Sequence, residues 1–141
     1  MNATVKEIKQ ENGVGVEVIT NDGRSFPCDM IVVGAGVIPA TKFVKGVALE
    51  RDQSLVCDEF MHVKGTDGLY ASGDIARFPL KFLHGESARI EHWGYAQYEG
   101  KVAALNMIGH KKEMDSVPFF WTVMFNKSIR YTGHALKYDE V

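Results

Sequence analysis

The chain has 141 residues, of which 45% are hydrophobic and 24% are charged, and its formal net charge is −2. This composition is typical of a globular protein, and the length allows one ordinary domain or parts of two. The small negative charge argues against nucleic acid as the main partner, and no apolar run approaches the roughly 20 residues that a membrane-spanning helix needs.

The first forty residues predict β structure. Val14, Val16 and Val18 occupy alternate positions, and this period of two indicates a strand with one apolar face. Residues 21–23, Asn-Asp-Gly, tolerate positive φ and fit a hairpin turn. The unbroken apolar run at residues 30–33 has the pattern of a strand buried on both faces. We therefore expect a β-meander that leads into a buried strand.

Short strands and turns are expected through the middle of the chain. Residues 54–57, 60–63 and 69–72 are short strand candidates, and the Gly-Thr-Asp-Gly sequence at 65–68 is typical of a turn. Cys28 and Cys57 are too far apart for a Cys-x-x-Cys redox pair, so we expect both to be buried thiols in strands. 

The pattern changes to that of a helix over residues 93–108. Small and apolar residues recur there at three- and four-residue spacing, and Gly109 is placed to end the helix. These positions are Trp93, Ala96, Gly100, Ala103, Ala104 and Met107. A polar linker at 111–113 precedes an aromatic-rich segment that begins at 117–121, and residues 128–132 predict a further strand.

Residues 66–76 carry the clearest chemical motif, Thr-Asp-Gly-Leu-Tyr-Ala-Ser-Gly-Asp-Ile-Ala. The expected order is strand, glycine, aspartate and helix start, which places Asp74 at the carboxyl end of a strand, where open α/β sheets bind ligands. A carboxylate there can accept hydrogen bonds from the hydroxyls of a ribityl or ribose chain. Asp74 could equally serve as a helix N-cap, and the spacing alone leaves both interpretations open.

The motif at 66–76 closely resembles the second FAD-binding motif of the pyridine nucleotide-dependent flavoproteins, an apolar residue followed by Tyr-Ala-x-Gly-Asp. That family includes ferredoxin reductases, monodehydroascorbate reductases and apoptosis-inducing factor-like flavoproteins. Three further segments resemble parts of the family in the same order. Residues 28–39 are similar to the strand and loop that close its NAD(P)H-binding domain. Residues 89–93 are similar to the start of the helix under the flavin ring, and residues 117–121 to the entry of its C-terminal interface domain.

The resemblance implies an α/β fold, namely a partial Rossmann-like FAD/NAD(P)-binding domain with a β-meander, truncated at the N-terminus. It implies that residues 1–45 end the NAD(P)H-binding domain, 46–112 form the C-terminal part of the FAD-binding domain, and 113–141 start a truncated interface domain. The implied function is electron transfer from NAD(P)H through FAD to an acceptor such as a ferredoxin, a quinone or a small molecule. Candidate partners are an electron-acceptor protein and a second copy of the chain. The first residues resemble neither a signal nor a transit peptide, so we expect an intracellular protein, cytoplasmic or mitochondrial.

The resemblance also assigns cofactor-binding roles residue by residue. The candidates are Gly34, Gly36, Gly73, Asp74, Ile75, Glu91, His92 and Trp93. Asp74 matches the residue that binds the ribityl chain of FAD, and Trp93 is expected beside the flavin or nicotinamide ring, its alternative being a core tryptophan. Glu91 could orient a ring or be a solvated carboxylate. The helix that follows could direct its N-terminal N–H groups at the flavin or simply pack on a sheet. The five histidines have no metal-ligand spacing.

One part of the family pattern is missing. Gly34-x-Gly36 is not a dinucleotide fingerprint, because Pro39 stands where the third glycine is expected. Both pyrophosphate-binding fingerprints are expected upstream of residue 1, so we predict that this chain alone binds FAD weakly or not at all. The alternative function is a non-catalytic dimerisation or interaction module that binds no cofactor.

Overall fold

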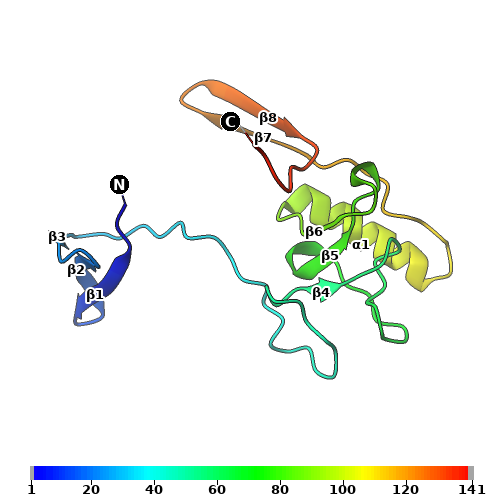
Figure 1. The fold of residues 1–141 in the computed structure, drawn as a ribbon, viewed down its shortest axis with the longest axis horizontal. Helices are drawn as coiled ribbons and strands as arrows, with labels where there is room; N and C mark the ends of the chain where they lie inside the picture. Colours follow the sequence, from blue (N-terminus) through cyan, green and yellow to red (C-terminus); the bar gives the residue numbers. More distant parts are fainter. Residues whose placement is uncertain (1, 140–141) are drawn as a thin grey trace. The chain divides into compact units, whose positions relative to one another are not determined.

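The computed structural model describes residues 2–139, and the chain divides between Val37 and Ile38 into two compact units. The first unit is an antiparallel sheet with the order β1-β2-β3, formed by β1 (Val5–Glu11), β2 (Val14–Thr20) and β3 (Ser25–Pro27) (Figure 1). Asn12 and Gly13 both have positive φ, at 51° and 82°, which suits a tight two-residue hairpin turn. The predicted β-meander is confirmed.

The second turn of this meander is held by Asp22. The Thr20 hydroxyl donates to Asp22 Oδ1 at 2.5 Å, and Arg24 Nε donates to Asp22 Oδ2 at 2.9 Å. Gly23 has a φ of 83°, which few other residues adopt without strain. The hairpin turn predicted at residues 21–23 is therefore confirmed.

The strand predicted at residues 30–33 is wrong. Among the described residues this segment pairs with no strand, and Met30, Val32 and Val33 are 79%, 86% and 72% exposed. Ile31 is the exception, since it is half-buried and packs closely against Gly15 of β2. A Cβ added to Gly15 would lie only 2.8 Å from Ile31 Cδ1. A strand buried on both faces needs neighbouring strands to pair its backbone and further layers to cover it, and the described residues supply neither.

The second unit is built on a small mixed sheet, β4 (Leu55–Val56), β5 (Ala76–Pro79) and β6 (Ser87–Ala88), in which β4 and β5 are parallel and β5 and β6 antiparallel. One helix, α1 (Trp93–Met107), buries Tyr95, Glu99, Val102 and Ala103. The ring of Tyr95 stacks on Phe78 of β5 with their centroids 6.0 Å apart. The apolar core that results is fully or nearly fully buried. Its members are Leu55, Cys57, Met61, Val63, Ala71, Ala76, Phe78, Leu80, Ala88, Ile90, Tyr95, Val102, Ala103 and Met114.

Helix α1 agrees with the sequence prediction in both position and ending. Gly109 adopts a φ of 84°, and the His110 N–H donates to the Leu105 carbonyl at 2.9 Å, so a carbonyl of the last turn is satisfied. The side chain of Asn106 donates to the Phe60 and Lys112 carbonyls at 3.1 and 2.7 Å. The end of the helix is thereby tied to two loops of the same unit.

Several local predictions in this unit need correction. Only Leu55–Val56 of the candidate at 54–57 is a strand, while 60–63 and 69–72 contribute single bridges. The segment after Gly73 is a single 3₁₀ turn, η1 (Gly73–Ile75), and it leads into β5 rather than into a helix. These pieces are too short to show a period of two, and their positions depend on packing against α1.

The two cysteines differ from each other. Cys57 is fully buried, and burial raises the pKa of its thiol to about 12. Cys28 is only half-buried and lies just after β3. The expectation of two buried thiols within strands is therefore wrong for Cys28, while Cys57 is buried and takes part in a single bridge to Val63.

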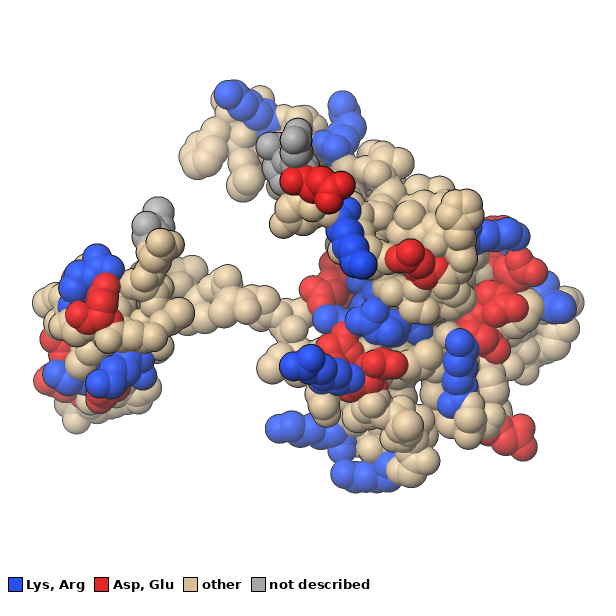
Figure 2. Space-filling model, viewed as in Figure 1, with Lys and Arg blue, Asp and Glu red and all other residues tan. Residues whose placement is uncertain are grey.

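The end of the second unit is a hairpin of β7 (Phe119–Met124) and β8 (Lys127–Thr132), joined by Phe125 and Asn126, both at positive φ. The strand predicted at 128–132 is confirmed. Many apolar side chains of this hairpin are exposed, including Trp121 at 58% and Phe125 at 96%. On the face drawn in Figure 2, acidic and basic side chains are interspersed over each unit. No helix within residues 2–139 is long and apolar enough to cross a membrane.

Candidate functional site

The turn at Gly73 and Asp74 is the centre of the candidate site. Gly73 has a φ of 77°, and a Cβ at this position would lie 3.6 Å from Ala96 Cβ, an ordinary contact distance. The glycine is therefore required by the backbone conformation rather than by lack of space. Ile75 packs against the core and fixes the far side of the turn. The sequence motif thus forms a tight turn in which Ile75 packs against the core and Asp74 is exposed.

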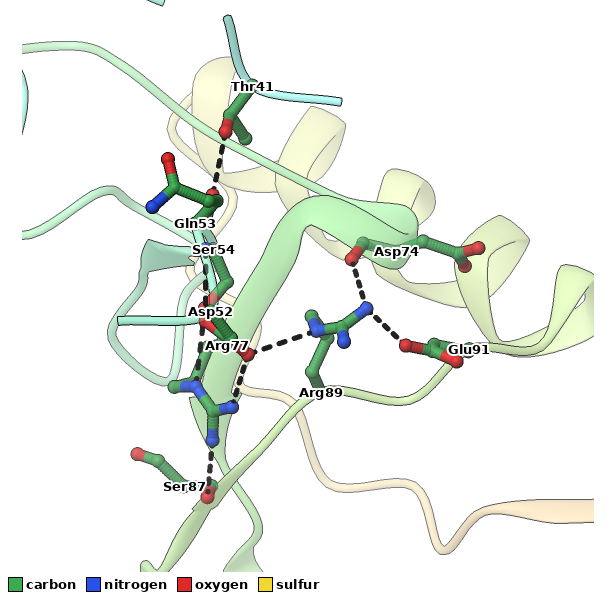
Figure 3. A network of polar contacts seen from close by, with 9 residues as sticks. All are labelled: Thr41, Asp52, Gln53, Ser54, Asp74, Arg77, Ser87, Arg89 and Glu91. Atoms are coloured by element: carbon green, nitrogen blue, oxygen red, sulfur yellow. Dashed lines mark hydrogen bonds and ion pairs between the residues drawn. The ribbon is translucent and has the colours of Figure 1, made fainter. Parts of the chain in front are cut away.

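The carboxylate of Asp74 is exposed and forms no hydrogen bond or ion pair with the described residues. In Figure 3 the carboxylate points away from the guanidinium of Arg89, whose bond to Asp74 is made to the main-chain carbonyl. The N-cap of η1 is Ser72 and that of α1 is His92, so Asp74 caps neither. The interpretation of Asp74 as a helix cap is wrong, and its carboxylate remains free to accept hydrogen bonds from a ligand.

Arg89 holds the main chain of this turn in place. Its Nη1 donates to the Asp74 carbonyl at 3.1 Å and pairs with the carboxylate of Glu91, while its Nε lies 3.4 Å from Asp52 Oδ2 (Figure 3). Arg77 binds the same Asp52 oxygen at 2.7 Å. Partial burial opposes ionisation of Asp52, but hydrogen bonds from Ser54 and Arg77 outweigh it and hold the pKa of this carboxyl well below its usual range. Asp52 is therefore a fixed anion that orients both guanidinium groups.

The helix α1 begins beside this network with free donors. The N-cap His92 makes no side-chain cap bond, and no acidic residue lies in the first turn. The main-chain N–H groups of Trp93 and Gly94 find no acceptor among residues 2–139. The helix dipole adds a partial positive charge at the same end. This end of α1 can therefore accommodate a group that carries or develops negative charge.

The rings of His92 and Trp93 are neighbours at that helix start, with centroids 6.0 Å apart, but they differ in their surroundings. His92 stacks on Phe120 with centroids 5.0 Å apart, and its Nδ1 is buried with no partner among the described residues. Trp93 is 69% exposed, so the alternative of a core tryptophan is wrong. Gly94 gives the His92 ring room, because a Cβ there would lie 3.3 Å from His92 Cε1. The Nδ1 atom is thus a buried polar group left without a hydrogen bond among the described residues, whereas the exposed indole is accessible to a ligand.

The structure brings most of the sequence-predicted residues into the second unit, but not all. Gly73, Asp74 and Ile75 lie in η1, and Glu91, His92 and Trp93 lie at the entrance of α1. Gly34 and Gly36 belong to the first unit, in the exposed segment after β3. These two glycines therefore belong to a different unit from the Asp74 turn.

Three residues near the turn were missed by the sequence prediction, namely Asp52, Arg89 and Glu99. Glu99 is fully buried, and its Oε2 accepts the Gly73 N–H at 2.5 Å. A detectable sign was available for Glu99 alone, since a glutamate three to four residues from Tyr95, Val102 and Ala103 is a charge within the buried stripe of a helix. Asp52 and Arg89 lie in segments without periodicity, and nothing in the sequence pairs them.

The described residues fit one side of a flavin dinucleotide site. The free carboxylate suits ribityl hydroxyls, and the open helix start and the orphaned His92 Nδ1 suit a polar ring. The cavity beside Glu91, lined by Arg89, Ile90, Glu91, Phe120 and His134, has a volume of about 220 Å³. This is below the ~300–1,000 Å³ of typical ligand pockets, so these residues cannot enclose the whole cofactor. No group of histidine, cysteine and acidic side chains suited to a metal is found within residues 2–139.

Comparison with known proteins gives consistent matches. The family model for pyridine nucleotide-disulphide oxidoreductases matches residues 1–100. Apoptosis-inducing factor 3 of Homo sapiens is 35% identical over 143 aligned residues, which cover 100% of this chain and 24% of the human protein. Peroxisomal monodehydroascorbate reductase 2 of Oryza sativa is 32% identical, over 89% of this chain and 27% of that enzyme. A ferredoxin reductase from Rhodopseudomonas palustris superposes with a TM-score of 0.80 at 27% identity, over 98% of this chain and 34% of its own. The chain thus spans about a quarter of the length of these two curated relatives.

Proposed function

This chain belongs to the pyridine nucleotide-disulphide oxidoreductase family, and we propose that it carries part of the flavin site of an NAD(P)H-dependent FAD oxidoreductase. The family resemblance inferred from the sequence is confirmed, as is the α/β fold class of a partial Rossmann-like domain. The relatives named above include a ferredoxin reductase and a monodehydroascorbate reductase. We propose that electrons pass from NAD(P)H through FAD to an acceptor of one of these kinds, a ferredoxin, a quinone or a small molecule.

The observation that carries this proposal is the free carboxylate of Asp74 on a rigid turn. Its main chain is fixed by Arg89 and by the Gly73–Glu99 hydrogen bond, yet its side chain has no partner among the described residues. An aspartate that only contributes a solvated charge to the surface does not need a main chain fixed in this way. In the proposed site Asp74 accepts hydrogen bonds from the ribityl hydroxyls of FAD and thereby fixes the position of the cofactor.

The other candidate residues would act on the ring system. FAD, when bound, supplies the chemistry that accepts hydride from NAD(P)H. The N–H groups of Trp93 and Gly94 would stabilise negative charge on the flavin pyrimidine ring, with the helix dipole adding to the effect. His92, held by its stacking on Phe120, would hydrogen-bond the cofactor through Nδ1, and Trp93 would cover the reacting rings. Glu91 forms an ion pair with Arg89, and we propose that its role is to orient that guanidinium group.

The division into functional parts follows the family pattern. We propose that residues 1–45 end an NAD(P)H-binding domain, that 46–112 belong to an FAD-binding domain, and that 113–141 start an interface domain. Gly34 and Gly36 would then act at the nicotinamide side of the site rather than at Asp74. Gly36, with a φ of 82°, adopts a conformation suited to a close backbone approach.

The test is FAD affinity, measured by quenching of flavin fluorescence, in the longer protein of which we propose that this chain is a part, called the full-length protein below. Asp74→Ala should weaken binding about ten- to a hundredfold, because a charge-assisted hydrogen bond contributes roughly 1.5–3 kcal/mol. The melting temperature of the apo form should change little, since the side chain forms no hydrogen bond or ion pair with a described residue. The matched control is Asp67→Ala, which removes an exposed carboxylate from a neighbouring turn and should leave affinity unchanged. Equal affinities of wild type and Asp74→Ala would refute the role of Asp74.

One observation favours a second candidate, an interaction module without a cofactor. The β7–β8 hairpin exposes Trp121, Val123 and Phe125, which would suit dimerisation or docking of a protein partner. Flavin absorbance of the purified full-length protein separates the two candidates. A colourless protein that neither takes up added FAD nor is reduced by NADH would support the interaction module.

A further inference from the structure

A carboxyl group lies buried directly beneath the Asp74 turn. Glu99 is 0% exposed and lies on the face of α1 that buries Tyr95, Val102 and Ala103. Its Oε2 accepts the main-chain N–H of Gly73 at 2.5 Å, across 26 positions of sequence. Its Oε1 is buried with no hydrogen-bond partner among the described residues. The side chain thus connects the helix to the turn through one oxygen and leaves the other unused.

The surroundings of Glu99 favour its neutral form. Burial raises the pKa of Glu99 to about 8, opposed by the hydrogen bond from Gly73 and reinforced by the carboxylate of Asp74. The titratable groups that face it are Asp74 from η1, the Cys57 thiol that follows β4, and Tyr95 of the same helix. None of these is basic, so an ionised Glu99 would have no compensating charge near it. A neutral carboxyl leaves only one unpaired O–H, which costs far less than a buried unpaired anion.

We propose that Glu99 is a positioning residue of the flavin site, whose neutral carboxyl holds the Gly73 N–H and keeps the Asp74 turn in the conformation that receives FAD. This inference rests on the proposed function. Deprotonation would place a second anion beside the Asp74 carboxylate. FAD itself carries two negatively charged phosphates, so an added buried anion would weaken its binding further. FAD bound over the turn should in turn favour the neutral form of Glu99, as linkage requires.

The first test needs no cofactor and uses the 141-residue chain itself. The side-chain carboxyl carbon of Glu99 and the backbone amide of Gly73 are followed by NMR from about pH 5 to about pH 10. Both should titrate together with a midpoint near pH 8. In Glu99→Gln the Gly73 amide should lose this titration, whereas Glu86→Gln, which alters an exposed carboxyl, should keep it. A Glu99 carboxyl that titrates in the ordinary range, or a Gly73 amide that does not follow it, would overturn the inference. The wild-type titration decides this even if Glu99→Gln fails to fold.

The second test measures FAD affinity of the full-length protein across the same pH range. Wild type should weaken by about fivefold or more above pH 8, while Glu99→Gln should show no such step. An Asp74-dependent affinity without a Glu99-dependent pH step would refute this inference and leave the proposed function intact. A full-length protein that binds no FAD at all would refute both. If Glu99 had only a structural role, Glu99→Gln would lower the stability of the fold, and the FAD affinity of wild type would show no step with pH.

Discussion

Replacing Arg89 with methionine should loosen the Asp74 turn while leaving the apolar core unchanged. The guanidinium is the only described group that binds the Asp74 carbonyl, and it also pairs with Glu91 and Asp52. Methionine keeps much of the aliphatic stem and removes the charge. Arg89 has a side-chain exposure of 13%, so its interactions are better shielded from solvent than those of an ordinary surface pair.

The magnitude follows from what each partner retains. Asp52 keeps its 2.7 Å pair with Arg77, and the contact with Arg89 is longer at 3.4 Å, so that loss is small. The carboxylate of Glu91 is 41% exposed and can be solvated by water, which limits its share to ~0.2–1 kcal/mol. The bond to the Asp74 carbonyl is charge-assisted but exposed, so its loss costs about 1.5 kcal/mol, the low end of the range for such bonds. We therefore expect a loss of about 2 kcal/mol in the free energy of unfolding of the second unit.

Urea denaturation and amide hydrogen exchange measure this directly. The unfolding free energy should fall by about 2 kcal/mol with an unchanged m-value, and the melting temperature by about 8 °C. Exchange at the amides of Asp74 and Ile75 should accelerate more than exchange in the interior of α1, because the damage is local. The matched control is Lys81→Met, which breaks an exposed ion pair with Glu113 and should change little. A loss below about 0.5 kcal/mol for Arg89→Met, or uniform acceleration of exchange, would refute the assigned role.

Two other predictions concern glycine and tryptophan positions. Gly73→Ala should destabilise the second unit by ~1–2 kcal/mol, because Gly73 has a positive φ. Gly100→Ala should stabilise the unit by ~0.5–1 kcal/mol, because Gly100 lies in a helix and an added Cβ would have its nearest neighbour at 3.8 Å. Chemical denaturation measures both changes, and equal effects would contradict the conformational argument. Trp93→Ala should cost less than about 0.5 kcal/mol, against ~3–5 kcal/mol for the buried Phe78→Ala, yet it should slow NADH reduction of bound flavin in stopped-flow experiments on the full-length protein; an unchanged rate would place Trp93 away from the reacting rings.

The elements that could be predicted from sequence are those whose pattern is local. Helix α1 has repeated small and apolar residues and a terminal glycine, and β2 has clear alternation followed by turn residues. The motif around Asp74 was recognisable by its resemblance to the second FAD-binding motif of the family, and the φ of 77° at Gly73 gives a backbone reason for one of its residues. For such features, a short window of sequence contains the physical cause.

The rest depended on contacts between distant positions. Residues 30–33 have the composition of a buried strand, but a strand needs partners, and none is present among the described residues. The strands β5 and β6 are four and two residues long and are defined by pairing to each other. Arg89 reaches Asp52 and Asp74 across 37 and 15 positions, which no periodicity reveals. Glu99 stands out in the sequence as a charge on the apolar face of a helix, but nothing in the sequence shows that it pairs with Gly73.

The exposed segment after β3 has a consequence for how the chain behaves at high concentration. Its exposed apolar residues Val32 and Val33 have high β propensity, carry no charge, and offer unpaired backbone donors and acceptors. Such a segment is a template for strand pairing between molecules, and Asp29, the charged residue next to it in the sequence, opposes this pairing. We therefore expect association between molecules through this segment to increase with protein concentration and, because salt screens the charge of Asp29, with salt concentration.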